Sequence, residues 1–461
     1  MKQSANQLKD LGFVYDVFAG FQFDLNTALK KTQIGYEEGH LCDHNCSLDC
    51  GNYSCPAAFS KNKGADPRSL LSLEEIISCL KNAKAGLELM NRQYLEEHFD
   101  TYVEKFKISE EVAKELKNTL KNGQVELNMF GGNPELHPDF LQIIKEAHKI
   151  GWRVTTTTTG KKFMHDEKFV EGFLSHPPDL LAISADDYDS IDELNEILEM
   201  DAPTIKKYWQ KANPLYGQRK KAYESMYVAK LAQDDSRFPK VLFNIVVHPG
   251  NLDCIDQMLD IFKRKYPEAI VNPYPAQSSF DHSPVVWQAE QLPQLEKFVD
   301  NMIQAQLEQA ETKNKSYVPR LPYWMALKSI FNSFQDKDKV AQYISGNKTW
   351  QCFREPGAGR YIQASSSDTS CQAGDRVGGH PGCFWNRSTV TLIDQHLWLM
   401  SPEEVADYLL NQKPKLPAKS KKSCPGCIMP RLMFDGPVIE QGLAPELIPE
   451  YLKLRKQYLS F

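Results

Sequence analysis

The sequence predicts an α/β fold with a parallel sheet, followed by a smaller C-terminal unit. Short apolar runs alternate with helical patterns through the middle of the chain, which is typical of βαβ units. After residue 346, Gly, Pro, Cys and Ser accumulate while hydrophobic periodicity fades. The 461 residues suit an α/β barrel of about 200 to 250 residues plus a smaller domain.

Composition narrows the class of protein. The formal net charge of -6 gives no electrostatic reason to expect a nucleic-acid partner. No run approaches the roughly 18 apolar residues of a membrane helix, and the N-terminus lacks the apolar centre of a signal peptide. We therefore expect a cytoplasmic protein that binds neither nucleic acid nor a membrane.

Five apolar segments are predicted to be strands: 125–130 (VELNMF), 152–160 (WRVTTTTTG), 180–185 (LLAISA), 241–247 (VLFNIVV) and 269–277 (AIVNPYPAQ). Helices are expected over 137–150 and 252–264, the second with Asn251 as its cap. Residues 70–121 and 204–235 are predicted helical insertions, either lids or ordinary surface helices. An amphipathic helical connector is expected over 286–345. Cys79 and Cys254 stand alone and are predicted to be plain buried side chains.

A first group of cysteines lies in GHLCDHNCSLDCGNYSCPAAF. Gaps of three, three and four residues separate Cys42, Cys46, Cys50 and Cys55. In a reducing cytosol such clustering indicates metal binding rather than disulfides. Thiolates this close together can converge on one iron-sulfur cluster or on one zinc ion. On these residues alone, both remain open.

A glycine turn follows the first of the predicted strands, in FGGNPELHPDFLQIIKEAHKIGWRVTTTTTG. Gly131 and Gly132 lack side chains, so backbone groups there can approach a ligand closely. Taken alone, the GGNP sequence is also typical of a plain strand-to-helix turn with Pro134 at an early helical position. Ser184 and Asp186 follow a later strand, where polar groups can approach the same ligand.

Together these segments resemble the radical S-adenosylmethionine (radical SAM) superfamily. The resemblance implies a partial (β/α)6 TIM-like barrel over 39–285, after an N-terminal extension at 1–38. It also implies a 4Fe-4S cluster on three thiolates, with S-adenosylmethionine on the remaining iron. The cofactor-binding residues implied are Gly131, Gly132, Asn133, Pro134, Thr159, Ser184 and Asp186.

Two features depart from the family's pattern. The family's loop is C-x-x-x-C-x-x-C, whereas Cys55 follows Cys50 after four residues. We favour Cys46, Cys50 and Cys55 as ligands, with the frame that uses Cys42 as the alternative. Asn133 stands where the family usually has Glu, which removes a charge but keeps an acceptor.

A second group of cysteines resembles the family's SPASM and twitch extensions. A small C-terminal iron-sulfur domain is expected over 346–461, with a single auxiliary 4Fe-4S cluster. Its predicted ligands are Cys352, Cys371, Cys424 and Cys427, while Cys383 replaces one of them or stays free. Zinc is the alternative occupant.

The resemblance implies reductive cleavage of S-adenosylmethionine to a 5'-deoxyadenosyl radical, which abstracts a substrate hydrogen. The expected substrate is a ribosomally made peptide that undergoes oxidation, crosslinking or epimerisation. A small-molecule dehydrogenase or rearrangement enzyme is the alternative, favoured by the lack of an obvious leader-binding domain before the barrel. The expected electron donor is a flavodoxin or ferredoxin. A zinc-stabilised binding module with a degenerate barrel is a hypothesis of another class.

Overall fold

A computed structural model describes residues 21–24, 72–97, 99–105, 109–122, 126–130, 133–185, 188, 190–212, 217–276, 287–312, 315–333, 338, 401–404 and 448–459. Its centre is a six-stranded, fully parallel sheet in which strand order follows chain order. The strands are β1 (Phe21–Asp24), β2 (Glu126–Phe130), β3 (Arg153–Thr158), β4 (Leu180–Ser184), β5 (Lys240–Val247) and β6 (Ile270–Pro275). This is the arrangement expected of an open (β/α)6 barrel.

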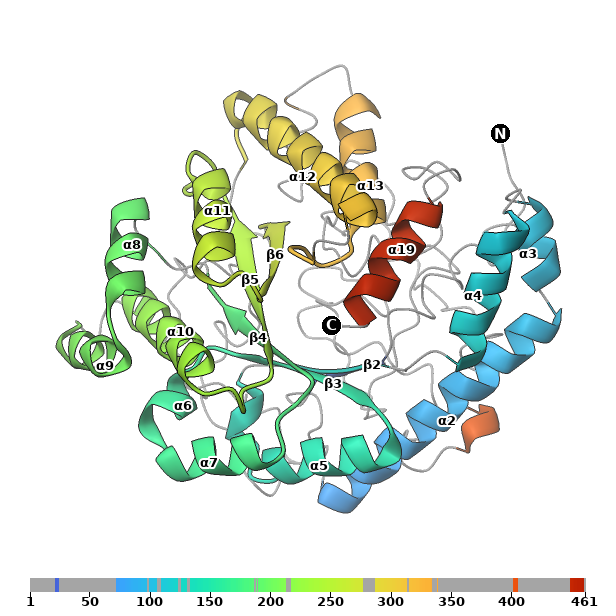
Figure 1. The fold of residues 1–461 in the computed structure, drawn as a ribbon, viewed down its shortest axis with the longest axis horizontal. Coiled ribbons are helices and arrows are strands. Elements are labelled where there is room, and N and C mark those ends of the chain that lie inside the picture. The colour runs from blue at the N-terminus through green and yellow to red at the C-terminus, as the bar shows by residue number, and fades with distance from the viewer. Residues whose placement is uncertain are drawn as a thin grey trace, which may run out of the picture.

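Helices connect successive strands, because parallel strands need a crossover connection. They are α2 (Leu73–Glu97), α3 (Phe99–Lys105), α4 (Glu110–Asn122), η3 (Pro134–Leu136), α5 (Phe140–Ile150), α6 (Lys161–His165), α7 (Glu167–Ser175), α8 (Ile191–Glu199), α9 (Ala202–Lys211), α10 (Gly217–Asp234), α11 (Ile255–Lys265), η5 (Ala289–Gln291), α12 (Leu292–Thr312), α13 (Leu321–Ser333) and α19 (Ile448–Leu459). In Figure 1 the sheet curves, with α5, α7, α10 and α11 along its outer side and α19 on its inner side.

The two faces of the sheet have different partners. Leu127, Val154, Ile183 and Phe243 belong to the main core, and the Phe243 ring lies 4.6 Å from the Phe262 ring of α11. Side chains of a strand alternate between faces. The opposite, inner face carries a separate apolar cluster of Leu180, Ala182, Leu242, Ile270 and Tyr458. This inner cluster lies at the amino-terminal part of β4, β5 and β6.

The five strands predicted from the sequence are all present. The sheet also contains β1, which falls inside the segment 1–38 that the sequence set aside as an extension. It pairs in parallel with β2, Phe21 opposite Leu127. The sheet therefore begins upstream of residue 39, where the barrel was expected to start.

The helical insertion expected before β2 contributes to the core. On α2, Ile76, Cys79, Leu80 and Ala83 are fully buried. The Trp152 indole donates to the Leu80 carbonyl over 3.2 Å. Thus α2 packs on the sheet as a helix of the first βαβ unit. Of the two alternatives for residues 70–121, a lid or ordinary helices, α2 is an ordinary helix.

Two further expectations concern the lone cysteines and the cap of α11. Cys79 is fully buried, as predicted, and Cys254 is partly buried. Asn251 does not cap α11, because that helix begins after Cys254. Instead the Asn251 side chain accepts from His248 N and donates to Val246 O, both over 2.8 Å, which closes the loop after β5.

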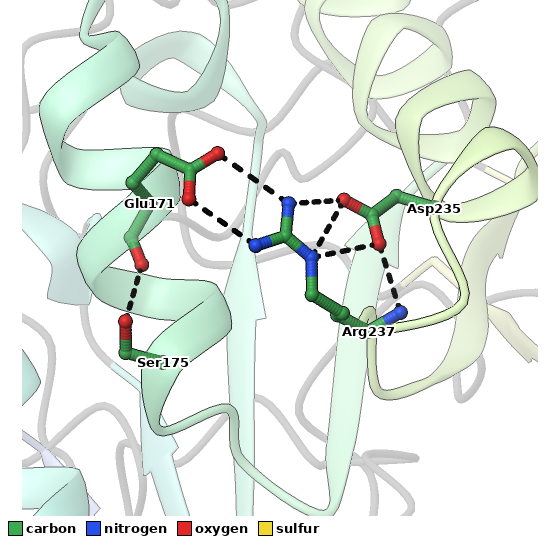
Figure 2. A network of polar contacts seen from close by, with 4 residues as sticks. All are labelled: Glu171, Ser175, Asp235 and Arg237. Carbon is green, nitrogen blue, oxygen red and sulfur yellow. Dashed lines mark hydrogen bonds and ion pairs between the residues drawn. The ribbon is translucent and has the colours of Figure 1, made fainter.

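An exposed charge network ties the turn after α10 to α7 (Figure 2). Arg237 donates to both carboxylate oxygens of Glu171 and of Asp235, and Ser175 donates to the Glu171 backbone oxygen. These hydrogen bonds raise the pKa of Arg237. The network precedes β5, at the edge of the sheet opposite the carboxyl ends.

No described helix is long and apolar enough to cross a membrane.

Candidate functional site

Ligands of open parallel sheets bind at the carboxyl ends of the strands, so the site is built from the residues that follow each strand. After β2, the chain enters η3 through Asn133, which is only 1% exposed. Thr159, directly after β3, donates its hydroxyl to Asn133 Oδ1 over 3.1 Å. The structure thus joins two of the predicted cofactor residues from neighbouring strands.

A second set of contacts joins the same turn to the residues around the end of β3. Thr158 donates its hydroxyl to Glu135 Oε1 over 2.8 Å and accepts from Gly160 N over 2.9 Å. Lys162 Nζ donates to the Glu135 backbone oxygen over 2.8 Å. Glu135 is 1% exposed, and a buried carboxylate is costly unless hydrogen bonded. These bonds hold the turn after β2 and the end of β3 as one rigid unit.

The end of β3 also abuts α10. Gly160 has a φ of 96°, and a Cβ there would lie 2.2 Å from the Glu224 backbone oxygen. Ser225 of α10 donates to the Thr159 carbonyl over 3.3 Å. The second helical insertion is therefore packed onto the site rather than standing away from it.

His137, the first residue of the helix expected over 137–150, is a buried structural residue. Its Nδ1 accepts from Asp139 N over 3.1 Å, so the hydrogen of the neutral ring sits on Nε2. Burial lowers the pKa of His137, although Asp139 opposes this effect. The neutral ring therefore stabilises the start of α5 and provides no charge to the site.

Ser184 ends β4, on the inner face of the sheet. The parallel register places it beside Asn244 of β5, which in turn lies beside Asn272 of β6. Sequence reasoning missed both asparagines. The available signal was an amide within an otherwise apolar strand, in VLFNIVV and in IVNPYP.

Several predicted site residues lie outside the described residues: Gly131, Gly132, Asp186, Cys42, Cys46, Cys50, Cys55, Cys352, Cys371, Cys383, Cys424 and Cys427. Within the described ranges, no three His, Cys, Asp or Glu side chains gather as a metal site would require. Of the predicted cofactor residues, Asn133, Thr159 and Ser184 are neutral hydrogen-bonding groups. Hydroxyl and amide groups are chemically able to hydrogen bond to the amino, carboxylate and ribose groups of a nucleoside such as S-adenosylmethionine.

Comparison with known proteins gives a family for part of the chain. Residues 96–262 match the family described as the Radical SAM superfamily. The match begins at the end of α2 and includes β2 to β5 and most of α11. It covers less than half of the chain and starts after the first cysteine group.

Two solved structures are similar over a larger part of the chain. A crystal structure of SuiB from Streptococcus suis is 12% identical, with a TM-score of 0.34, over 70% of this chain and 55% of that one. A crystal structure of SuiB bound to S-adenosylmethionine is 12% identical, with a TM-score of 0.32, over 62% and 48%. The chain thus spans about half the length of the SuiB chains it matches.

Proposed function

We propose that this chain, whose residues 96–262 form a radical SAM superfamily domain, is an enzyme that reductively cleaves S-adenosylmethionine and abstracts a substrate hydrogen. One observation carries the proposal. The family match coincides with a parallel sheet whose β2 and β3 ends meet through the Thr159 to Asn133 hydrogen bond. That is the edge where a parallel α/β sheet binds ligands.

The proposed cluster ligands are Cys46, Cys50 and Cys55, with Cys42 as the competitor for the third position. A loop of three or four residues between thiolates is short enough to span one cluster face. These thiolates would hold the cluster, which would supply the one-electron reduction of S-adenosylmethionine and hence the radical chemistry of the proposed reaction. The chain's own part is to hold the cofactor and to exclude water from the inner face of the sheet.

For the cofactor, we assign hydrogen bonding to Asn133, Thr159 and Ser184, alongside the backbone of Gly131, Gly132 and Pro134 and the carboxylate of Asp186. The Thr159 to Asn133 bond pre-orders two of these groups. Asn133 is an amide in place of a carboxylate, so its contact with the cofactor's ammonium group is a hydrogen bond from a charged donor to a neutral acceptor rather than an ion pair.

The finer assignments extend this proposal. We place an auxiliary 4Fe-4S cluster on Cys352, Cys371, Cys424 and Cys427, in a cytoplasmic enzyme that receives electrons from a flavodoxin or ferredoxin. The leading substrate is a ribosomally made peptide, and a small molecule is the alternative. A gene for a short precursor peptide beside this one, and a mass change in that peptide on incubation with the enzyme, would support the peptide over the small molecule.

Anaerobic reconstitution tests the proposal. The iron-loaded protein is expected to show visible iron-sulfur absorption and, with dithionite, to release 5'-deoxyadenosine from S-adenosylmethionine. Cys50→Ala is expected to abolish that release, because both ligand frames use Cys50. Chromatography quantifies 5'-deoxyadenosine, and electron paramagnetic resonance reports the reduced cluster.

Cys254→Ala is the matched control. Cys254 stands apart from both cysteine groups, and burial together with Asp253 raises the pKa of its thiol, so little thiolate is present to bind iron. This variant is expected to keep full iron content. Zinc in place of iron, with no cofactor cleavage by the wild type, would favour the zinc-stabilised binding module. Full cleavage by Cys50→Ala would overturn the ligand assignment.

A further inference from the structure

Polar side chains cross the inner face of β4, β5 and β6 in one row. Ser184, Asn244 and Asn272 are neighbours in the parallel register. Asn272 Nδ2 donates to Asn244 Oδ1 over 2.6 Å. Phe243, beside Asn244 in β5, packs on Phe262 of α11, and α11 lies on the outer side of the sheet (Figure 1). Because side chains alternate along a strand, the row faces the inside of the curved sheet.

Arg320 sets the direction of the hydrogen bonds along this row. A guanidinium group can only donate. Its Nε lies 2.7 Å from the Asn272 side chain, so the atom that it meets there is the amide oxygen. Asn272 must then offer its nitrogen to Asn244, which offers its oxygen in return. Asn244 Nδ2 therefore points away from Asn272. The guanidinium donor of Arg320 thus assigns the oxygen and nitrogen positions of both amides.

Two glutamines of α12 hold the segment that carries Arg320. Gln309 accepts from Tyr317 N over 2.8 Å and donates to Tyr317 O over 2.9 Å. Gln306 accepts from Arg320 N over 2.8 Å and donates to Val318 O. Both glutamine side chains are buried, and they pair with the backbone as a neighbouring strand would. The helical connector thereby fixes the position of Arg320.

Val271 of β6 completes the support for this segment. Its N donates to Ser316 O over 2.8 Å, and its O accepts from Val318 N over 3.1 Å. The segment before α13 thus extends the sheet beyond β6. Arg320 follows at its end and reaches Asn272 on the inner face.

Asn244 is the end of this chain of donors. Its side chain is partly buried, and its Nδ2 makes no hydrogen bond to any residue in the described ranges. Two N–H groups are thus presented to the inner face, level with the last residue of β4. Both N–H groups are held in place by the Asn272 contact and have no acceptor among the described residues, so this preset amide suits a bound oxygen atom.

We propose that Asn244 Nδ2 binds a carbonyl or carboxylate oxygen of the substrate, with its orientation set by Arg320 through Asn272. The proposal rests on the proposed function and narrows its substrate to molecules that bring an oxygen acceptor to the inner face. A peptide carbonyl meets this requirement. A donor-only cation does not.

Binding of small probes to the full chain tests this assignment without reductant, so it does not depend on cofactor cleavage. The probes are N-acetylalanine N'-methylamide, N-acetylalanine and methylguanidinium, observed by saturation-transfer NMR. The wild type is expected to bind the neutral amide, the carboxylate or both, and to ignore methylguanidinium. Comparison of the first two separates a carbonyl from a carboxylate acceptor.

Two variants sharpen the result. Asn244→Asp replaces the donors with acceptors, so binding of the acceptor probes should weaken about three- to tenfold, the value of one hydrogen bond, and methylguanidinium should begin to bind. Asn244→Ala should likewise weaken binding of the acceptor probes, without gaining the cation. Asn195→Asp, the same exchange on the exposed side of α8, is the matched control and should behave as the wild type.

Three outcomes would overturn the assignment. They are equal binding of the acceptor probes by wild type, Asn244→Asp and Asn244→Ala, binding of methylguanidinium by the wild type, and no binding of either acceptor probe by the wild type. Failure of cofactor cleavage with the expected probe pattern would instead remove the proposed function and leave an acceptor-binding sheet face.

Discussion

Two glycines, Gly151 before β3 and Gly160 after it, have a left-handed backbone conformation. Gly160 combines a positive φ of 96° with a backbone oxygen 2.2 Å from the place of a Cβ. Gly151 has a similar φ of 92°, but its nearest neighbour is the flexible end of Lys84 at 3.4 Å. A side chain at Gly151 would therefore add backbone strain alone, whereas one at Gly160 would add both strain and a steric collision.

We predict that Gly160→Ala lowers the free energy of unfolding by about 3 kcal/mol or more, because left-handed strain of roughly 1–2 kcal/mol is joined by displacement of α10. Gly151→Ala should cost only the strain, about 1–2 kcal/mol. Urea unfolding measures both. Equal losses in the two variants would contradict the close packing of α10 on β3.

Asp179 links three elements at the amino-terminal edge of the sheet. Its Oδ2 accepts from Val154 N of β3 over 2.7 Å and lies 3.0 Å from His148 Nε2 of α5, while the residue itself precedes β4. Burial disfavours its charge, but the hydrogen bonds from His148 and Val154 outweigh burial and lower its pKa.

The lowered pKa of Asp179 predicts how stability depends on pH. A carboxylate of lowered pKa stabilises the fold above its unfolded pKa of about 3.9, and that contribution is lost as pH falls through the folded value. Asp179→Asn should thus destabilise the protein by roughly 1 kcal/mol near pH 7, a small value because the side chain is 40% exposed. The difference from wild type, followed by urea unfolding, should shrink toward pH 3. A difference that grows on acidification would refute the link.

The sequence predicted those strands whose formation depends on their own residues. The run VELNMF and the Thr-rich run after Trp152 became β2 and β3 because β-branched and apolar residues suit a buried parallel strand. The four residues of β1 are too few to show a periodicity. The pairing of Thr159 with Asn133 was within reach because both residues follow strands. The Asn244 row was not, because it depends on sheet register and on Arg320, 48 residues after Asn272.

At the scale of the whole molecule, α19 joins the C-terminal part of the chain to the sheet. Tyr458 packs on the inner apolar cluster, its ring lies 5.0 Å from the Arg153 guanidinium carbon, and its hydroxyl donates to Glu126 over 3.2 Å. Arg153 and Thr155 donate to the same carboxylate oxygen of Glu126. A region expected to be ordered by a metal cluster thus also contributes a helix to the inside of the sheet.

This arrangement predicts graded losses at Tyr458. Tyr458→Phe removes one of three hydrogen bonds to Glu126 and should cost about 0.5–1.5 kcal/mol of unfolding free energy. Tyr458→Ala also empties the space beside Leu180 and Ile270, so we expect a loss of about 3–5 kcal/mol. Lys453→Ala, on the exposed side of the same helix, should change little. If Tyr458→Ala unfolds at the same urea concentration as the wild type, α19 does not stabilise the sheet.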